Sequence, residues 1–418
     1  MNDTTTYLRL WHNVTNVTNG NESGLANSTI IDYIPYEKRP ETYIVPVVFF
    51  IIFVVGVIGN GTLVVIFLRH RTMRNVPNTY ILSLALADLL VIITSVPFTS
   101  TIYTVDSWPW GLTICKISET AKDISIGVSV FTLTALSADR FFAIVDPLKK
   151  FHTSSGGKKA TRITLCVAIS IWILSIICAI PAAIGSHLKT FDEGDISFVV
   201  CYPYPSWLNN KYPQVMVLAK FCILYLVPLA IIAIFYICMA VYLIISTRNV
   251  PGEIQGMQRQ IRARKKVAIT VLVFVLMFAV CFLPSNMFMM FFYFHPNASE
   301  IYNDFWHFLR IIGFCLSYLN SCANPVALYF VSGAFRKHFN RYLLCIKPKR
   351  SRCNTCQGQH TTQMSLVSTK RQQSVCGVRK GGQGVSINRR PLEPPLITQE
   401  TSVALLLNNG EEHMCSKI

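Results

Sequence analysis

Polar side chains that could bind a small cation stand inside long apolar stretches of this sequence. Asp88 follows Asn78 by ten residues, which places it about 15 Å along a helix, near the middle of a bilayer. Ser129 and Asn320 reach a similar depth in their own stretches, and Asn324 shares the stretch of Asn320. A carboxylate, a hydroxyl and amides at one level could hold water and a hard cation such as Na⁺. A buried hydrogen-bond network that only fixes helix packing fits these residues equally well.

Charged side chains gather near one end of the third apolar stretch. Glu119, Lys122 and Asp123 are three and four residues apart, so they share one face of a helix. Lys220 in the fifth stretch and Arg310 near the start of the seventh add charges that lipid cannot solvate. Five ionisable groups at comparable depth predict a wet cavity that binds a ligand. The alternative is mutual pairing: Lys122 with either neighbouring acid, and Lys220 with an acid in a loop.

Apolar side chains at similar depth would form the walls of such a cavity. For any single one of them, packing in the core or against lipid is the better interpretation. The candidates are Phe98, Phe282, Met289, Phe292 and Phe314.

Seven apolar stretches carry these residues, and each is long enough to cross a hydrocarbon core of about 30 Å as a helix. Their approximate bounds are Tyr43–Leu68, Thr79–Tyr103, Leu112–Val145, Ile163–Ile184, Val215–Ile245, Val267–Phe294 and Phe305–Phe330. Composition agrees, since 52% of the residues are hydrophobic and only 14% are charged. The sequence therefore predicts an all-α membrane protein, a bundle of seven transmembrane helices.

Two signals predict which side of the membrane each loop occupies. Short basic loops follow the first, third and fifth crossings, which marks that side as cytosolic. Five N-x-S/T sequons precede the first crossing, and glycans are added on the lumenal side. The sequons begin at Asn2, Asn13, Asn16, Asn21 and Asn27. Both signals predict an extracellular amino end and a cytoplasmic carboxyl end, in a multi-pass protein of the plasma membrane.

The net positive charge comes from the same basic loops that indicate the cytosolic side. The formal net charge of +17 is concentrated in the short loops on one side, which argues against a nucleic-acid partner. No cleavable signal peptide is visible at Met1, so we expect the first crossing to direct insertion.

Two of the fourteen cysteines fall in predicted exterior segments. Cys115 precedes the third crossing and Cys201 lies in the loop after the fourth. That compartment permits disulfides, so we expect this pair to be bridged and to hold the loop over the mouth of the bundle.

Composition divides the chain into four segments. Residues 1–41 are a polar, glycosylated extracellular tail, and residues 42–332 hold the seven crossings. Residues 333–346 separate apolar from basic side chains, which predicts an amphipathic helix in contact with membrane lipid. Cys345 ends that segment and is a candidate for palmitoylation, with an unmodified thiol as the alternative. Residues 347–418 predict a disordered cytoplasmic tail whose serines and threonines are candidate phosphorylation sites.

Features that could move lie at the cytosolic edge and within the crossings. Asp139 and Arg140 close the third crossing, either as an interfacial anchor or as a latch that opens when the bundle rearranges. Proline removes a backbone hydrogen bond and kinks a helix, so each proline could be a hinge or could only shape the packing. Those within crossings are Pro97, Pro181, Pro228, Pro284 and Pro325.

Together these residues resemble the rhodopsin-like (class A) G-protein-coupled receptors, over nearly the whole span from Tyr43 to Cys345. The matching motifs, in chain order, are Gly59-Asn60, Leu84-Ala85-Leu86-Ala87-Asp88, Asp139-Arg140, Trp172, Pro228 with Tyr236, Pro284, and Asn324-Pro325. The resemblance implies a signalling receptor, not an enzyme, with a heterotrimeric G protein as partner. It implies that Arg140, Leu148 and the basic start of the sixth crossing, including Lys265, contact that G protein.

Longer strings resemble a narrower branch. LSYLNSCANPVALY at 316–329, LSADR at 136–140 and FRKHF at 335–339 look like the bombesin receptors. RNVPNTY at 74–80, WPWG at 108–111 and AIVDPL at 143–148 look like the CCHamide neuropeptide receptors of arthropods. The resemblance implies activation by a short, secreted, amidated, disulfide-closed neuropeptide, and signalling through Gq to calcium. A class A receptor for a different peptide or for an amine is the alternative.

Three positions depart from the family pattern. Phe141 stands where a tyrosine usually follows the arginine of the third crossing, and Phe282 replaces the tryptophan of the pocket floor. Leu328 takes the usual tyrosine position of the seventh crossing, and Tyr329 follows it, turned about 100° around the helix. We hypothesise that Tyr236 carries more of the active-state water network here.

Other classes of protein find less support. A retinal-binding light receptor needs a Schiff-base lysine in the seventh crossing, and residues 305–330 contain no lysine. A transporter predicts repeated halves, and the sequence shows no such repeat. No nucleophile–base spacing or zinc-helix motif indicates catalysis, and no cofactor is expected apart from the candidate sodium ion.

Overall fold

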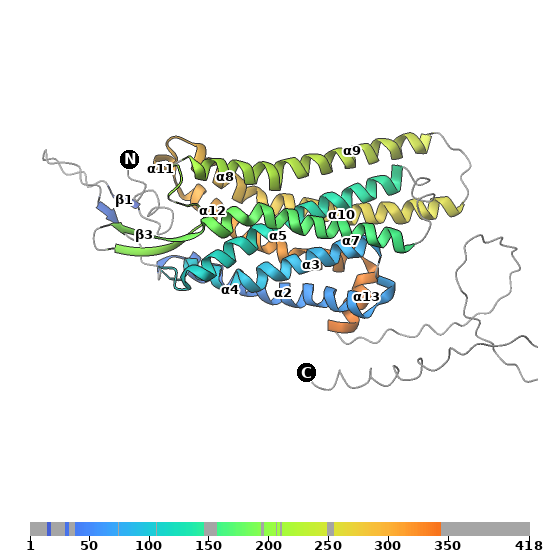
Figure 1. Cartoon of the computed structure of the whole chain (residues 1–418), viewed down its shortest axis with the longest axis horizontal. Coiled ribbons are helices and arrows are strands. Elements are labelled where there is room, and N and C mark those ends of the chain that lie inside the picture. The colour runs from blue at the N-terminus through green and yellow to red at the C-terminus, as the bar shows by residue number, and fades with distance from the viewer. Residues whose placement is uncertain are drawn as a thin grey trace, which may run out of the picture. The chain divides into compact units, whose positions relative to one another are not determined.

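The computed structural model describes residues 15–17, 30–32 and 38–343, apart from residues 74, 106, 146–156, 194–195, 206, 210 and 249–254. Among these residues, seven helical spans are long and apolar enough to cross a membrane, which confirms the seven-helix bundle. The spans run side by side (Figure 1). They are α2 (Glu41–Arg69), α3 (Val76–Thr94), α5 (Gly111–Val145), α7 (Gly157–Gly185), α8 (Tyr212–Phe221) continued by α9 (Val227–Arg248), α10 (Gln255–Phe294) and α12 (Asp304–Val331).

Shorter elements connect the spans. The helical ones are η2 (Arg71–Met73), α4 (Val96–Thr99), η3 (Ser100–Tyr103), η4 (Cys222–Leu226), α11 (Ala298–Ile301) and α13 (Gly333–Leu343). Two antiparallel hairpins are formed by β1 (Thr15–Val17) with β2 (Ile30–Asp32), and by β3 (His187–Glu193) with β4 (Ile196–Tyr202). The second hairpin lies at one end of the bundle and α13 at the other (Figure 1).

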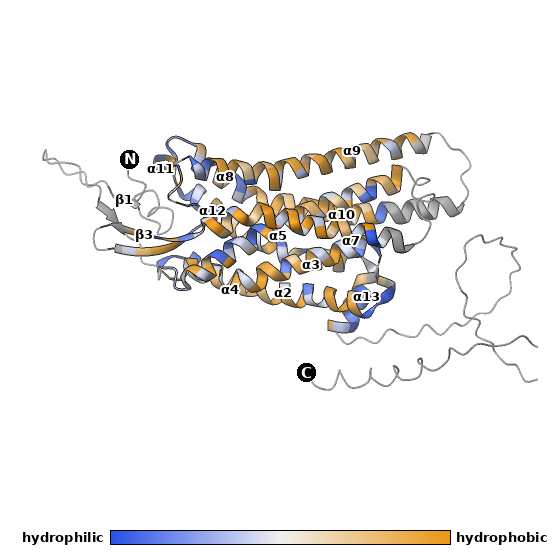
Figure 2. Ribbon diagram, viewed as in Figure 1, coloured by the Kyte–Doolittle hydropathy of each residue, from blue (hydrophilic) through white to orange (hydrophobic). Residues whose placement is uncertain are grey.

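Several polar side chains are buried inside the bundle beside its apolar core, and large apolar side chains are exposed on its outer face. Asn60, Asp88 and Thr132 are fully buried, whereas Ile237 and Val280 are more than half exposed. Apolar residues cover most of the length of the spans, and hydrophilic ones gather toward their ends (Figure 2). An outer face of this kind is unfavourable in water and favourable in lipid, because the hydrocarbon core offers polar side chains no partner.

The second stretch is not one continuous helix, although the sequence predicted a single crossing there. It breaks at Ser95, where φ is −123° and ψ is −50°, and α4 begins with Pro97 in its first turn. Proline has no N–H for the preceding turn, so the helix ends just before it. The hydroxyl of Ser95 donates to the carbonyl oxygen of Ser118 on α5 at 2.8 Å, which satisfies a buried polar group at the break.

The fifth and sixth spans also differ from simple helices. The five residues of η4 form a π-helical turn between α8 and α9, directly before Pro228. Wide turns of this kind re-aim the side chains that follow them. The helix α10 begins at Gln255, twelve residues before the predicted Val267, so Lys265 and Lys266 lie on a helix.

The long loop between α7 and α8 forms a hairpin that the sequence did not predict. Cys115 at the start of α5 and Cys201 on β4 form the predicted disulfide, with Cα atoms 5.5 Å apart. The backbone N–H of Trp108 also donates to the carbonyl oxygen of Val199 on β4 at 2.7 Å. The hairpin is thus attached to two neighbouring segments at the mouth of the bundle.

The helix α13 has the predicted amphipathic pattern. Phe335 and Phe339 are buried against the bundle, whereas Arg336, Lys337 and Arg341 are exposed. The predicted segment extended to residue 346, and the described helix ends at Leu343.

Several predicted sites lie outside the described residues. They are Leu148, Cys345, the tail from 347 to 418, and the sequons at Asn2, Asn13, Asn21 and Asn27. Asn16 belongs to β1, where only the backbone is described.

Candidate ligand-binding site

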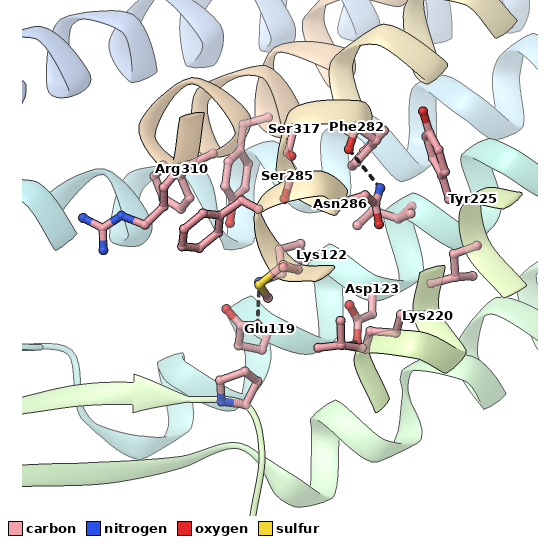
Figure 3. A pocket seen from close by; sticks show the side chains of 18 of the residues that line it. Glu119, Lys122, Asp123, Lys220, Tyr225, Phe282, Ser285, Asn286, Arg310 and Ser317 are labelled. Atoms are coloured by element: carbon pink, nitrogen blue, oxygen red, sulfur yellow. Dashed lines mark hydrogen bonds and ion pairs between the residues drawn. The ribbon is translucent and has the colours of Figure 1, made fainter. Parts of the chain in front are cut away.

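A cavity of about 320 Å³ lies among α5, α8, α10 and α12, in the half of the bundle nearer the β3–β4 hairpin (Figure 3). Tyr103 of η3 closes part of it, and Pro203 and Tyr204 follow directly after β4. Because the disulfide fixes β4 to α5, the residues after Cys201 are held at the rim of the cavity. The volume and the mixture of apolar and polar side chains are those of a ligand site.

Two ion pairs occupy one side of the cavity. Lys122 Nζ lies 2.5 Å from Glu119 Oε2, within α5, and this pair is drawn in Figure 3. Lys220 Nζ of α8 lies 2.6 Å from Asp123 Oδ2, whose side chain is almost completely buried. Lys122 therefore has the acidic partner that one interpretation of the sequence gave it. The expectation that Lys220 would pair with a loop acid is wrong, because the helix α5 supplies the carboxylate.

Arg310 of α12 lies apart from both pairs (Figure 3). Its guanidinium carbon is 5.7 Å from the centroid of the Tyr103 ring. In the described part of the chain, no carboxylate lies within ion-pair distance of it. The cavity therefore combines two neutralised pairs with one positive charge that a ligand's acidic or carbonyl oxygen could satisfy.

Three of the five predicted apolar wall residues line the cavity: Phe282, Met289 and Phe314. Phe98 and Phe292 do not. Phe98 lies beyond the break at Ser95, and its ring packs edge-on against Trp110 with centroids 5.3 Å apart. Phe292 contacts Phe288 and Tyr293 instead.

Sequence reasoning missed much of the lining. On α10 the missed residues include Phe278, Ser285 and Asn286, which stand four, three and four residues from Phe282. That helical spacing around Phe282 is a signal that could have identified them. No local signal identifies Tyr204, because the course of the hairpin after β4 places it there. The Asn286 side-chain amide donates to the carbonyl oxygen of Phe282 at 2.9 Å, which leaves its own oxygen as an acceptor (Figure 3).

Comparison with known proteins decides the family. Residues 59–329 match the model of the family described as "7 transmembrane receptor (rhodopsin family)". The chain belongs to this family. As a member it is a signalling receptor, not an enzyme, and a multi-pass protein of the plasma membrane.

Named relatives are similar over most of this receptor's length. The Neuropeptide CCHamide-1 receptor of Drosophila melanogaster is 55% identical over 391 residues, which cover 92% of this chain and 76% of the relative. A bombesin receptor of Bombina orientalis is 41% identical, over 73% of this chain and 77% of the relative. Bombesin receptor subtype-3 of Ovis aries is 38% identical, over 76% of this chain and 82% of the relative.

The polar centre of the receptor holds the candidate cation ligands in two pairs. Asn324 Nδ2 donates to Asp88 Oδ2 at 2.9 Å, and all four candidate residues are buried. Asp88 Oδ1 and Ser129 Oγ have no hydrogen-bond partner among the described residues. Ser129 and Asn320 also line a void of about 20 Å³. Oxygen atoms that lack donors in a buried polar centre fit a small hard cation or a water molecule.

The opposite end of the bundle holds the candidate switch. Asp139 and Arg140 form an ion pair, and Arg140 is only 8% exposed. Burial favours the latch over the interfacial anchor, because an anchoring arginine would extend to the surface. The hydroxyl of Tyr236 donates to the carbonyl oxygen of Ala268 on α10 at 2.8 Å.

The remaining switch residues are placed as follows. Pro284 lies within α10 and Pro325 within α12. Tyr329 of α12 packs edge-on against Phe339 of α13, with ring centroids 6.2 Å apart. Lys265 is exposed on α10.

Proposed function

We propose that this receptor is activated by a secreted neuropeptide of the CCHamide type and that it signals through a heterotrimeric G protein, chiefly Gq, to intracellular calcium. The observation that carries the proposal is the cavity, whose charged and aromatic lining suits a peptide. The 55% identity to a CCHamide-1 receptor supports the class of ligand. The bombesin receptors among the relatives support a peptide rather than a small amine.

The ion pairs in the cavity also argue against an amine ligand. An amine needs a carboxylate that is free to pair with its ammonium group. Asp123 is paired with Lys220, and Glu119 is paired with Lys122. The charge without an acidic partner in the described cavity is that of Arg310, which attracts acceptors.

The peptide would act by shifting a conformational equilibrium. It drives the receptor toward the open state only by binding that state more tightly than the closed one. A tenfold shift needs about 1.4 kcal/mol of differential affinity. Outward movement of α10 about Pro284 would accompany opening of the Asp139–Arg140 latch and would expose the surface around Arg140 and Lys265 to the G protein.

A sodium ion beside Asp88 would favour the closed state. Asp88 and Ser129 supply unpartnered oxygens, and Asn320 and Asn324 complete the polar centre. Such an ion would offset the carboxylate charge in a site that a repacked bundle no longer provides.

The modifications that we propose, glycosylation, palmitoylation and phosphorylation, follow from the sequence. The sequons face the exterior as glycosylation sites and Cys345 is palmitoylated at the cytosolic leaflet. The tail would be phosphorylated by a receptor kinase and would then bind arrestin.

The test is calcium mobilisation in cells that express this chain, challenged with amidated neuropeptides and with biogenic amines. The expected result is a response to a CCHamide-type peptide that disappears in cells lacking Gq and in cells without the receptor. A response to amines together with silence to peptides would overturn the proposal.

A further inference from the structure

Three side chains of the fifth span are hydrogen-bonded to the backbone of α10. The donor and acceptor pairs are Gln214 Nε2 to Tyr293 O at 2.9 Å, Tyr225 Oη to Ala279 O at 2.9 Å, and Tyr236 Oη to Ala268 O at 2.8 Å. A backbone carbonyl moves only when its helix moves. These bonds therefore fix the position of α10 relative to the fifth span, independently of the side chains that α10 carries.

The spacing of these bonds locates them relative to the kink. Eleven residues separate each donor from the next, and all three side chains reach α10 although the π-helical turn η4 lies within this span. Eleven residues also separate Ala268 from Ala279, but fourteen separate Ala279 from Tyr293, and Pro284, a residue type that kinks helices, lies between the last two. Two of the bonds, those of Tyr225 and Tyr236, hold the cytosolic half of α10. Of these two, the Tyr225 bond to Ala279 is the nearer to Pro284.

Tyr225 also forms part of the ligand cavity. Its ring is nearly parallel to that of Phe278, at 27° and 6.4 Å between centroids. Phe278 in turn contacts Phe282 on the floor, with centroids 4.6 Å apart. The ring of Tyr225 thus lines the cavity, and its hydroxyl is hydrogen-bonded to the backbone of α10.

The other side of the kink is held by α12. A Cβ atom on Gly313 would lie 2.6 Å from the backbone nitrogen of Ser285, so only glycine permits this approach. The kinked part of α10 therefore lies between Gly313 on one side and Tyr225 on the other. A change in the position of the Tyr225 ring cannot be absorbed by displacement of α10 toward α12.

We propose that Tyr225 is a positioning residue of the receptor, whose hydroxyl restrains α10 in the closed arrangement until a ligand displaces its ring. The inference rests on the proposed function. It names Tyr225 as the side chain through which a ligand in the cavity changes the position of α10 at Pro284. The bond to Ala279 then breaks as the cytosolic half of α10 moves away.

The test is Tyr225→Phe, which keeps the ring and removes only the hydroxyl. Loss of one hydrogen bond from the closed state should raise basal G-protein signalling per surface receptor by a factor on the order of five. The peptide EC50 should fall by a similar factor, because a larger fraction of the receptor is competent to bind. A side chain that only filled space would leave both quantities unchanged or would lower surface expression.

The matched control is Gln214→Leu, which removes a bond of the same kind beyond the kink. Its basal signalling should equal that of the unmodified chain. Unchanged basal signalling in Tyr225→Phe, or an equal rise in Gln214→Leu, would overturn the inference.

A distance measurement separates this inference from the proposed function. Spin labels at Lys265→Cys on α10 and Arg71→Cys on η2 report the movement of α10 without any ligand, in a background whose other reactive cysteines are replaced. Tyr225→Phe should increase the population with the longer distance. If it does so while every peptide fails to activate, the ligand assignment is wrong and the role of Tyr225 stands; an unchanged distance distribution would refute that role.

Discussion

Four of the five ionisable side chains in the cavity neutralise one another in pairs, which determines what a ligand can still bind. Glu119 and Lys122 are one turn apart on the same helix, so sequence spacing alone could place them together. Asp123 and Lys220 are nearly a hundred residues apart, and only the packing of the fifth span against α5 unites them. Residues far apart in sequence thus set the charge of the cavity as much as the local pattern does.

Replacing Lys122 by alanine tests the nearer pair. The change leaves Glu119 without its partner and removes a donor from the cavity, so peptide activation should weaken by more than about tenfold, as expected for a hydrogen bond to a charged group. The dose–response curve is measured at equal surface expression. Lys116→Ala, on the same helix but away from the cavity, should behave like the unmodified receptor, and an unchanged curve for Lys122→Ala would remove Lys122 from the binding site.

The pair of Asp123 with Lys220 should contribute to stability. Asp123→Asn leaves Lys220 uncompensated in a half-buried position and should lower the melting temperature of the purified receptor. The double variant with Lys220→Met should lose less than the sum of the single losses, with a coupling of about 0.5–3 kcal/mol. Strict additivity would show that the two charges do not interact.

At the scale of elements, close contacts and breaks decide the geometry that hydrophobic pattern leaves open. The break at Ser95 carries Phe98 away from the cavity, although its sequence position suggested a wall residue. Contact between α10 and α12 at Gly313 and Ser285 is closer than any larger residue would allow. Neither feature could be deduced from apolar periodicity, because periodicity gives the face of a helix and not its course.

Gly313→Ala measures the importance of that contact. The added methyl group meets the backbone of Ser285, so the helices must separate, at a cost of about 1–3 kcal/mol of unfolding free energy. Gly61→Ala is the control, because nothing lies within 4 Å of its added Cβ and alanine favours a helix by roughly 0.5–1 kcal/mol. In nanodiscs, the melting temperature should fall for Gly313→Ala and rise for Gly61→Ala. Shifts of the two melting temperatures in the same direction would contradict the close contact at Gly313.

The junction of α13 with the end of α2 should depend on pH. Desolvation, followed by the charges of His70, Arg341 and Lys337, lowers the pKa of His338 below its ordinary value of 6.5. The rings of His70 and His338 are in contact at 4.3 Å between centroids, and His70 Nε2 lies 3.1 Å from the Tyr342 hydroxyl. The docked helix favours neutral His338, so docking is fully stable above pH 6.5 and weakens as the pH falls below it.

Hydrogen exchange of α13, corrected for the intrinsic effect of pH, provides the measurement. Exchange should become faster between pH 7.5 and 5.5. His338→Phe keeps a ring at this position without a titratable group, so the variant should lose the dependence. An equal dependence in both proteins would assign the effect to another group.

At the scale of the whole molecule, the seven spans and their disulfide were predictable because the membrane imposes a strict rule on length and polarity. The spacing on α5 and the positions of Phe282 and Phe314 were sufficient to indicate a cavity. The hairpin that brings Tyr204 to its rim was not predictable, because it depends on the pairing of β3 with β4 and on a hydrogen bond from Trp108, which is remote in sequence. The prediction that the two ends of the chain face opposite sides remains to be tested by epitope tags at Met1 and Ile418.

The central claim is that a peptide in the cavity and a G protein at the opposite end bind the same conformation. Coupling between two sites is reciprocal, so each partner must raise the affinity for the other by the same factor. The most direct measurement is the dissociation constant of a labelled CCHamide-type peptide for receptor in nanodiscs, with and without nucleotide-free Gq. We expect Gq to tighten peptide binding by about 5–150-fold and a non-hydrolysable GTP analogue to reverse the effect. Peptide affinity that is the same under all three conditions would contradict the account.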